Sequence, residues 1–312
     1  PPRSTLFPYT TLFRSGRGFE ITRMRLRRTL VSVIFLMPAI ILMAVFFVYP
    51  LIRVFVMSFQ YWRVLKGAEF IGLDNYAKLL RDSEFWKSLW NTIIYTAIVT
   101  PMIFVPAIAL ANCLKTTTRR TRILRTIFFI PVAISFVSAS YLWKWIYNDT
   151  AGLLNYLLNL AGFIRGQQSW LSETWMARTM VSVMIAWKTQ GMTMIILIAG
   201  LQSIPQALYE AAEMDGASKR QRFRFITLPM LRPVVVLSLI ISIAGSFKAF
   251  DHFFIMTRGG PMKTTQTIVM YINKLAFEYF DIGFGSAVSV VLLVILFIVS
   301  ALQMKLGGYK ND

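Results

Sequence analysis

Cysteine and histidine are almost absent from this chain of 312 residues, which contains one of each, Cys113 and His252. A single cysteine excludes an intramolecular disulfide and argues against a cysteine-based metal site. A single histidine argues in the same way against a multi-histidine metal centre. The sequence also lacks a G-x-x-x-x-G-K-[ST] phosphate loop, an H-E-x-x-H helix and a G-x-S-x-G nucleophile motif. We therefore expect no cofactor, no metal and no enzymatic activity in this chain.

Acidic residues are also scarce, with 14 Asp and Glu against 33 Lys and Arg, and the net charge is +19. A positive charge is compatible with nucleic-acid binding, but these basic residues stand beside apolar runs and do not form one extended face. Hydrophobic residues make up 56% of the chain, and its mean hydropathy is +0.58. Composition therefore predicts an all-α polytopic membrane protein in contact with membrane lipid, without a nucleic-acid partner.

Six apolar runs are long enough to cross a bilayer, which requires about 20 apolar residues. They predict one transmembrane domain of six helices over residues 30–308. Prolines occur inside several of these runs. They are compatible with a helical bundle that lines a cavity and equally with ordinary packing of membrane helices. The predicted spans are Leu30–Ile52, Asn91–Leu114, Arg125–Tyr147, Thr179–Leu201, Pro233–Ala249 and Gly285–Met304.

The two ends of the chain are short and polar. Residues 1–18 have no helical periodicity, and we interpret them as an artefactual or disordered tail. Residues 19–29 form a basic segment that a signal peptide would also contain. The apolar run from Leu30 is too long for a signal-peptide core and has no small-residue cleavage site, so we expect an uncleaved first span. Residues 309–312 form the C-terminal tail.

Basic residues gather in the loops of one face. The tract Lys115–Arg125 holds five basic residues and no acid. Two predicted spans separate it from Arg23–Arg28 and two separate it from Lys219–Arg232, so all three segments lie on the same face of the membrane. The opposite loops mix basic residues with nearly as many acids. The positive-inside rule therefore predicts a multi-pass protein of the bacterial cytoplasmic (inner) membrane, with both termini and residues 202–233 in the cytoplasm.

Residues 202–233 are the one long polar insertion in the second half of the chain. The first part predicts a helix over Gln206–Met214, with Ser203 as its N-cap and Pro205 at the first helical position. We expect Gly216 to end this helix, because glycine takes a left-handed conformation without steric cost. The insertion thus begins with a short helix and a sharp corner.

A second helix is predicted beyond the corner. Ser218 is its expected N-cap, and it should continue through Phe225 before Pro229 ends it. Basic residues follow the corner, so the insertion presents a small-residue helix, a turn and a positive arm. We interpret this combination as a docking element.

A spaced motif runs through the same insertion: EAA, three residues, G, nine residues, then I-x-L-P. It is complete at every fixed position and resembles the EAA loop of membrane permease subunits of bacterial ABC importers. The resemblance implies the type I importer permease fold and an ATPase-coupling role for the loop, with a structural linker as the alternative. The implied coupling residues are Glu210, Ala211, Ala212, Asp215, Gly216, Ala217, Ile226, Leu228 and Pro229.

The resemblance also implies partners and a solute class. The partners are a second permease subunit, two ATP-binding subunits that hold ATP and Mg, and an extracytoplasmic solute-binding protein; analogy with the carbohydrate branch favours a heterodimeric pore. Transport would follow alternating access. The T-x-G-G-P turn Thr257–Pro261 is similar to the outer loop of carbohydrate-branch permeases, which favours a sugar or sugar-like solute.

Lys188 lies near the middle of the fourth predicted span, where an ionisable group is costly unless it faces protein or water. A position on the solute pathway is one interpretation. The alternatives are a contact with a backbone carbonyl or a pair with a carboxylate of another subunit. We also expect Trp145 and Trp187 to offer apolar faces to a sugar ring.

Ser238, Ser242 and Ser246 recur every four residues on one face of the fifth predicted span. Such spacing marks close helix packing more often than a solute path. Beyond them, snorkelling and an interfacial ion pair explain Lys248, Asp251 and His252 at the outer end of the span. Similarity to the maltose-type members implies a substrate-pathway role for Lys188, Thr189, Ser242, Gly245 and Ser246.

Two other functions compete with the importer permease. An ATPase-independent secondary transporter or channel would carry paired intramembrane acids or inverted repeats, and neither is present in the sequence. A membrane-embedded assembly or sensor subunit would dock an ATPase without carrying a solute, and sequence alone leaves that alternative open.

Overall fold

The computed structural model describes residues 33–63 and 67–307. The chain divides into two compact units, residues 1–56 and residues 57–312. The predicted tail over residues 1–18, the basic segment 19–29 and the C-terminal residues 309–312 lie outside the described residues.

One apolar helix, Val33–Met57, accounts for the described part of the first unit. It contains the π-turn η1 (Ala44–Val48), which is followed by α2 (Tyr49–Met57). With 25 residues it is long enough to cross a membrane. The predicted first span, Leu30–Ile52, overlaps it over all of its described residues.

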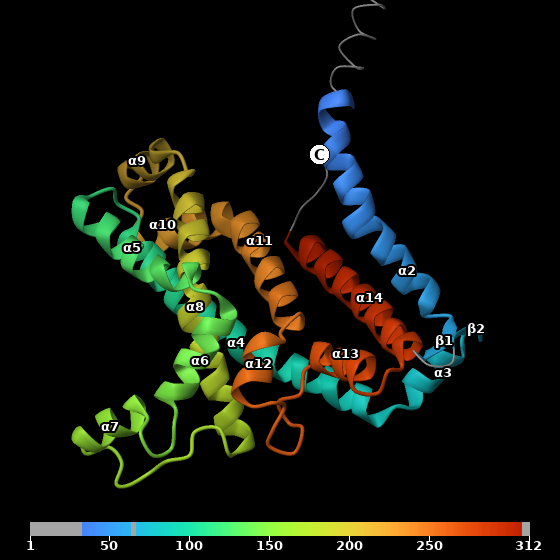
Figure 1. Ribbon diagram of the computed structural model, residues 1–312. Helices are drawn as coiled ribbons and strands as arrows, with labels where there is room; N and C mark the ends of the chain where they lie inside the picture. The colour runs from blue at the N-terminus through green and yellow to red at the C-terminus, as the bar shows by residue number, and fades with distance from the viewer. Residues whose placement is uncertain (1–32, 64–66, 308–312) are drawn as a thin grey trace, which may run out of the picture. The chain divides into compact units, whose positions relative to one another are not determined.

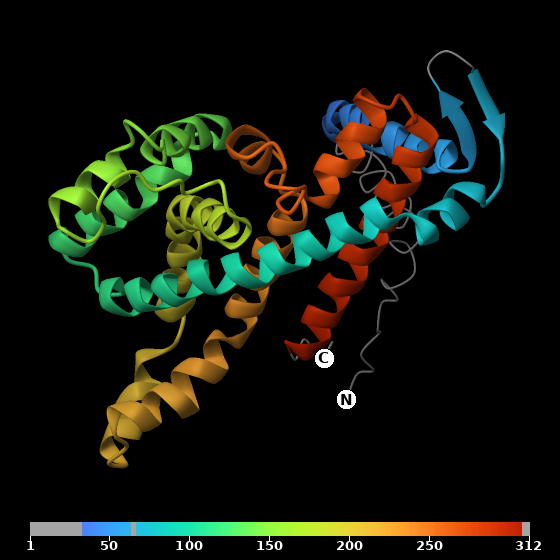
Figure 2. The same ribbon diagram turned by 90° about the horizontal axis from the view of Figure 1, so that it is seen from below.

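The second unit is built almost entirely of helices, which Figures 1 and 2 show from two directions. Within the described residues the only strands are the antiparallel hairpin β1–β2, which pairs Gln60 with Phe70. The elements are β1 (Gln60–Arg63), β2 (Gly67–Phe70), α3 (Asp74–Arg81), α4 (Ser83–Leu114), α5 (Arg119–Ala133), α6 (Phe136–Ile146), α7 (Leu153–Leu160), α8 (Thr174–Gln202), α9 (Gln206–Met214), α10 (Lys219–Arg222), η2 (Phe223–Thr227), α11 (Leu228–Phe247), α12 (Asp251–Met256), α13 (Ile268–Phe277) and α14 (Ile282–Leu306).

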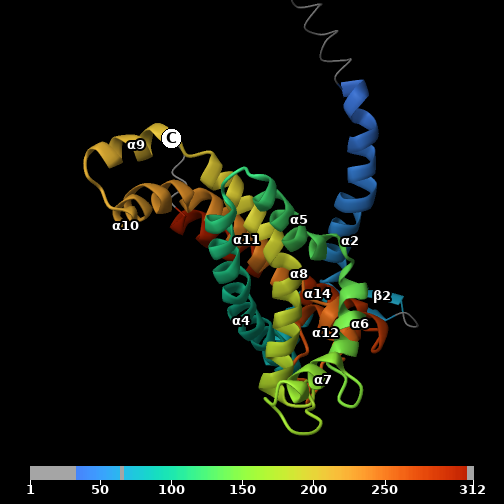
Figure 3. The ribbon, with the colours of Figure 1, turned by 90° about the vertical axis from the view of Figure 1, so that its left-hand side faces the viewer.

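Helices α4 and α8 form the centre of this unit. Val99 of α4 and Val181 and Met184 of α8 are fully buried in one apolar cluster. Nearer the α9 end, the small Ala107 and Ala111 of α4 are fully or almost fully buried in a second cluster. Helices α9 and α10 lie at one end of α8, and α7 lies at the other end (Figures 1 and 3).

Five helices within the described residues are long and apolar enough to cross a membrane, and α5 with α6 makes a sixth crossing if the two are counted together. The predicted span Arg125–Tyr147 is covered by α5 and α6, which are two helices that meet at 97°. Ile134 and Ser135 have extended backbone at the break, and Ser135 caps α6 by accepting the amide N–H of Ser138. The run holds Pro131 and Ser135 beside the break, but α4 also contains two prolines and stays one helix, so these residues alone do not reveal the break.

Candidate functional site

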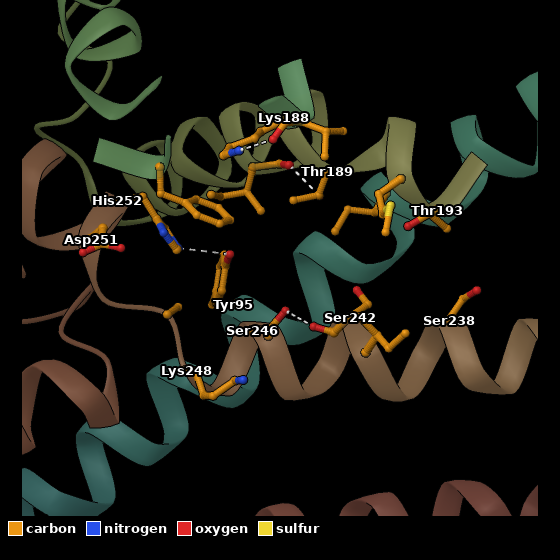
Figure 4. Close-up of a pocket in the computed structure, with 18 of the residues that line it drawn as sticks. Tyr95, Lys188, Thr189, Thr193, Ser238, Ser242, Ser246, Lys248, Asp251 and His252 are labelled. Carbon is orange, nitrogen blue, oxygen red and sulfur yellow. Dashed lines mark hydrogen bonds between the residues drawn. The ribbon is translucent and has the colours of Figure 1, made fainter. Parts of the chain in front are cut away.

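A cavity of about 450 Å³ lies between α4, the α5–α6 break, α8, α11 and the start of α12 (Figure 4). Its walls include all five of the predicted pathway residues. Lys188 and Thr189 enter from α8, and Ser242, Gly245 and Ser246 enter from α11. The structure therefore gathers these side chains around one space, while their contact with a solute stays a prediction.

Lys188 is only 4% exposed in this cavity wall. Its Nζ donates to the carbonyl oxygen of Ile134 at 2.6 Å and lies 3.4 and 3.5 Å from those of Val132 and Pro131. These carbonyls lie at and just beyond the C-terminal end of α5, where helix carbonyls lack the usual intrahelical donors. That of Pro131 also accepts the amide N–H of Ile134 at 3.2 Å. Nζ also lies 4.4 Å from the centre of the Phe136 ring. Lys188 thus caps the open end of α5, as a cation at a helix C-terminus does.

Gly191, one turn beyond Lys188, sets the distance between α5 and α8. A Cβ at this position would overlap the backbone carbonyl oxygen of Phe128. Only glycine lets the two backbones come this close. The close approach keeps the Lys188 ammonium within hydrogen-bond distance of the α5 carbonyls.

The hydroxyl groups of the cavity differ in what they already bind. Thr189 donates to the carbonyl of Ile185 at 2.7 Å, and Ser246 donates to the carbonyl of Ser242 at 2.9 Å. The side-chain hydroxyl of Ser242 is buried and has no hydrogen-bond partner among the described residues. No atom lies within 4 Å of a Cβ built on Gly245, so the α11 surface is open there. Among the described residues, Ser242 is thus a cavity-lining residue whose buried hydroxyl has an unused donor.

Tyr95 and His252 close the α12 end of the cavity as a buried pair. The Tyr95 hydroxyl lies 3.2 Å from Nε2 of His252, which is 6% exposed. Burial lowers the pKa of His252 to about 3, so the imidazole is neutral at pH 7. The expected interfacial ion pair is wrong: within the described residues, Lys248 and Asp251 line the cavity without an ion pair.

The aromatic walls of the cavity are not the ones expected from the sequence. Trp187 packs against Trp143, with ring centres 5.5 Å apart, and Trp145 is 57% exposed; neither Trp145 nor Trp187 lines the cavity. The aromatic residues that do line it are Tyr95, Phe136 and Phe250.

Sequence reasoning did not identify Thr193, Tyr95 or Phe136 as cavity residues. Thr193 lies four residues after Thr189, so helical spacing on α8 would have placed it on the same face. No comparable signal exists for Tyr95, because its partner His252 lies 157 residues away in the sequence.

The predicted docking element is a helical hairpin at the opposite end of α8 from α7 (Figure 3). Helix α9 spans Gln206–Met214 as predicted. Gly216 has φ +77°, and two bonds close the corner: the N–H of Ala217 to the carbonyl of Ala212 at 2.9 Å, and that of Gly216 to Glu213 at 3.0 Å. This pair of bonds is the Schellman arrangement that satisfies the last carbonyls of a helix.

None of the α9 residues is buried. Glu210 and Ala211 are exposed, Ala212 is half-buried, and Met214 is 89% exposed at the end of the helix. This face is therefore accessible to a partner. Of the remaining predicted coupling residues, Asp215, Gly216, Leu228 and Pro229 are exposed, and Ala217 and Ile226 are half-buried.

Two local predictions in this loop are wrong. Ser203 does not cap α9; its hydroxyl donates back to the carbonyl of Gly200 at 2.8 Å, and Pro205 occupies the N-cap position without a side-chain bond. Ser218 does cap the second helix, in a capping box with Gln221. Pro229 does not end that helix, because the π-turn η2 precedes it and the widened turn tolerates a residue without an N–H.

The T-x-G-G-P turn is anchored at the same end of the unit as α12. Arg178 of α8 donates to the carbonyl of Thr264 at 2.9 Å and to the side chain of Asn91 at 2.7 Å. The hydroxyls of Thr257 and Thr265 lie 2.7 Å apart across the turn. The turn thus has a fixed geometry beside the N-terminal parts of α4 and α8.

Comparison with known proteins gives consistent results. The family described as "Binding-protein-dependent transport system inner membrane component" matches residues 105–306. The chain is 36% identical to the sulfoquinovosyl glycerol transport system permease protein SmoG of Agrobacterium fabrum, over 90% of this chain and 92% of that protein. It is 35% identical to the arabinooligosaccharides transport system permease protein AraP of Bacillus subtilis, over 89% of each.

A solved structure has the same fold. It is the crystal structure of a bacterial ABC transporter involved in the import of the acidic polysaccharide alginate. The TM-score is 0.78 at 22% identity, and the match covers 93% of this chain and 99% of that chain. The predicted importer permease fold is therefore confirmed.

Proposed function

Because the chain belongs to the family of binding-protein-dependent transport system inner membrane components, we propose that it carries a sugar or sugar-like solute through the cavity between α8 and α11. The observation that carries this proposal is the buried, unpaired hydroxyl of Ser242 in a cavity with aromatic walls. The named relatives that transport sulfoquinovosyl glycerol and arabinooligosaccharides support this solute class.

The chemistry of the cavity suits a sugar. Sugar rings present apolar C–H faces, which pack against aromatic rings, and hydroxyls, which need hydrogen-bond partners. Phe136 and Tyr95 provide the ring faces, and Ser242 provides an unused donor. The volume of about 450 Å³ falls in the range of small-molecule sites, roughly 300–1,000 Å³.

The α9–α10 hairpin is the proposed contact with an ATPase. Its EAA residues, of which Glu210 and Ala211 are exposed, and the left-handed corner at Gly216 form an accessible element that could transmit a displacement to α8 and α11. The partners are a second permease subunit, two ATP-binding subunits that hold ATP and Mg, and a solute-binding protein. The hairpin and both termini then face the cytoplasm, in keeping with the basic tract Lys115–Arg125.

Alternating access would move the cavity between the two faces of the membrane. A displacement at the hairpin passes directly into α8 and α11, because α9 and α10 connect them. Both helices line the cavity, so the two sites share the same moving parts. Family membership favours this ATP-driven mechanism over an ATPase-independent carrier.

A graded series at Gly245 tests the cavity as the solute path. We expect uptake of labelled sugar by the reconstituted transporter to fall as Ala, Val and Leu replace Gly245, because each larger side chain enters open space in the cavity. Ser289→Leu, on α14 outside the cavity, is the control. Full uptake by Gly245→Leu in a correctly folded transporter would contradict the proposal.

A further inference from the structure

A second and larger cavity lies at the hairpin end of the unit. Its volume is about 810 Å³, and it is lined by the α4–α5 connection, the C-terminal end of α8, and residues of α9, α10 and η2. None of the predicted coupling residues lines it. It is therefore separate from the exposed face of α9 that is proposed to meet an ATPase.

Three cations line this cavity, and no carboxylate does. Lys115 comes from the α4–α5 connection, and Lys219 and Arg222 come from α10. Arg222 forms one ion pair with Glu213 at 2.8 Å, but that carboxylate is 68% exposed. Within residues 33–63 and 67–307, Lys115 and Lys219 form no ion pair. The three positive charges repel one another across the cavity, and an anion bound between them reduces this repulsion.

Hydrogen bonds hold the walls of the cavity in place. Gln202 at the end of α8 donates to the carbonyl of Lys115 at 3.0 Å. The hydroxyls of Tyr209 and Thr227 lie 2.9 Å apart and join α9 to η2. Arg125 donates to the carbonyl of Leu114 at 2.6 and 2.9 Å and so fixes the α4–α5 connection. The cations are thus attached to fixed backbone around a preformed space.

The cavity also offers apolar surface. Ile204 and Phe223 contribute to the lining beside the charged and amide groups. A ligand that fits both must carry an anionic group and an apolar part. A phosphate ester meets both needs, since arginine binds phosphate oxygens in a bidentate manner and lysine binds them as a point charge.

We propose that this cavity binds the phosphate group of a phosphate ester, which bridges the α4–α5 connection and the α9–α10 hairpin. Two sources share this chemistry: the headgroup of an anionic phospholipid, which the lipid boundary of a membrane protein would supply, and a soluble phosphate compound such as a nucleotide. The site does not depend on the solute or on ATPase docking.

The test uses the purified full chain in lipid nanodiscs. One arm compares phosphatidylcholine discs with discs that contain added phosphatidylglycerol, and the other adds AMP to phosphatidylcholine discs. Native mass spectrometry counts bound ligands, and thermal unfolding gives their apparent affinity. The pocket variant is Lys115→Gln with Lys219→Gln and Arg222→Gln. The control, Arg119→Gln with Arg120→Gln and Lys305→Gln, removes the same charge from exposed positions outside the cavity.

We expect one ligand per chain in one of the two arms. Affinity should fall at least about tenfold in the pocket variant and less than about twofold in the control, because each charge-assisted bond to phosphate contributes more than a tenfold change in affinity. Equal losses in the two variants, or no saturable binding to the wild type in either arm, would overturn the proposal. Should the triple variant fail to fold, Lys219→Gln alone against Arg120→Gln gives the same comparison.

Discussion

The cavity between α8 and α11 and the α9–α10 hairpin both contain polar groups. The hydrogen bonds in the two regions differ in how far apart in the sequence the bonded residues lie. In the hairpin, the bonds from Ala217 to Ala212 and from Arg222 to Glu213 join residues at most nine positions apart. In the cavity, Lys188 bonds a carbonyl 54 residues away, and Tyr95 meets a partner 157 residues away. The hairpin can therefore move as one unit, whereas the cavity changes shape only when helices shift against one another.

Lys188→Met should have the largest effect on the cavity. It removes the ammonium donor from the buried carbonyl of Ile134, and we expect a loss of about 3 kcal/mol or more of stability together with loss of transport. Lys144→Met is the control, since Lys144 donates to the carbonyl of Ile255 at an exposed position and should cost under about 1 kcal/mol. Thermal unfolding in one detergent measures both. Equal stability of Lys188→Met and wild type would show that the break needs no cation.

Two glycines allow a tight helix contact to be compared with the open wall of the cavity. Gly191→Ala would push a methyl group into the Phe128 carbonyl and should cost about 1–3 kcal/mol. Gly245→Ala has open space and should stabilise α11 by about 0.5–1 kcal/mol. Unfolding midpoints of the two variants should therefore move in opposite directions. A similar shift for both would mean that α5 and α8 are not held at this distance.

His252 predicts a pH-dependent effect on stability. Burial lowers the pKa of the folded imidazole to about 3, whereas the unfolded chain titrates near about 6.5. Between these values the unfolded state binds the extra proton, so stability should fall as the pH falls, by up to about 1.4 kcal/mol per pH unit. Unfolding measured from pH 7 to pH 4 should show this slope in the wild type. An equal slope in His252→Gln would rule out His252 as its source.

The same difference in sequence separation explains which features of the structure the sequence predicts well. The bounds of α9, the left-handed Gly216 and the Ser218 cap all depend on neighbouring residues, and each was predictable from local chemistry. The gathering of Lys188, Thr189 and Ser242 around one cavity was anticipated only through the family resemblance.

Other features depend on contacts that no local pattern reveals. Pro131 and Ser135 flank the break at Ile134, but its geometry also depends on Lys188 of another helix, which donates to the carbonyl of Ile134. The π-turn that accommodates Pro229 belongs to a helix of 29 residues, so a local rule for proline gave the wrong end. Trp187 packs against Trp143 and away from the cavity because helix packing, not residue type, decides which aromatic rings face it.

The most direct test of the coupling role is purification of the full chain, in mild detergent, from membranes that contain its partner subunits. Wild type, Gly216→Val and Gly216→Asn are compared for a retained ATP-binding subunit. Asparagine accepts the left-handed corner and valine does not, and no atom lies within 4 Å of a Cβ built on Gly216, so the difference between them is one of backbone conformation. We predict that the wild type and Gly216→Asn retain the ATPase and that Gly216→Val loses it while remaining folded. Retention of the ATPase by Gly216→Val, or its absence from the wild type, would contradict coupling through this hairpin.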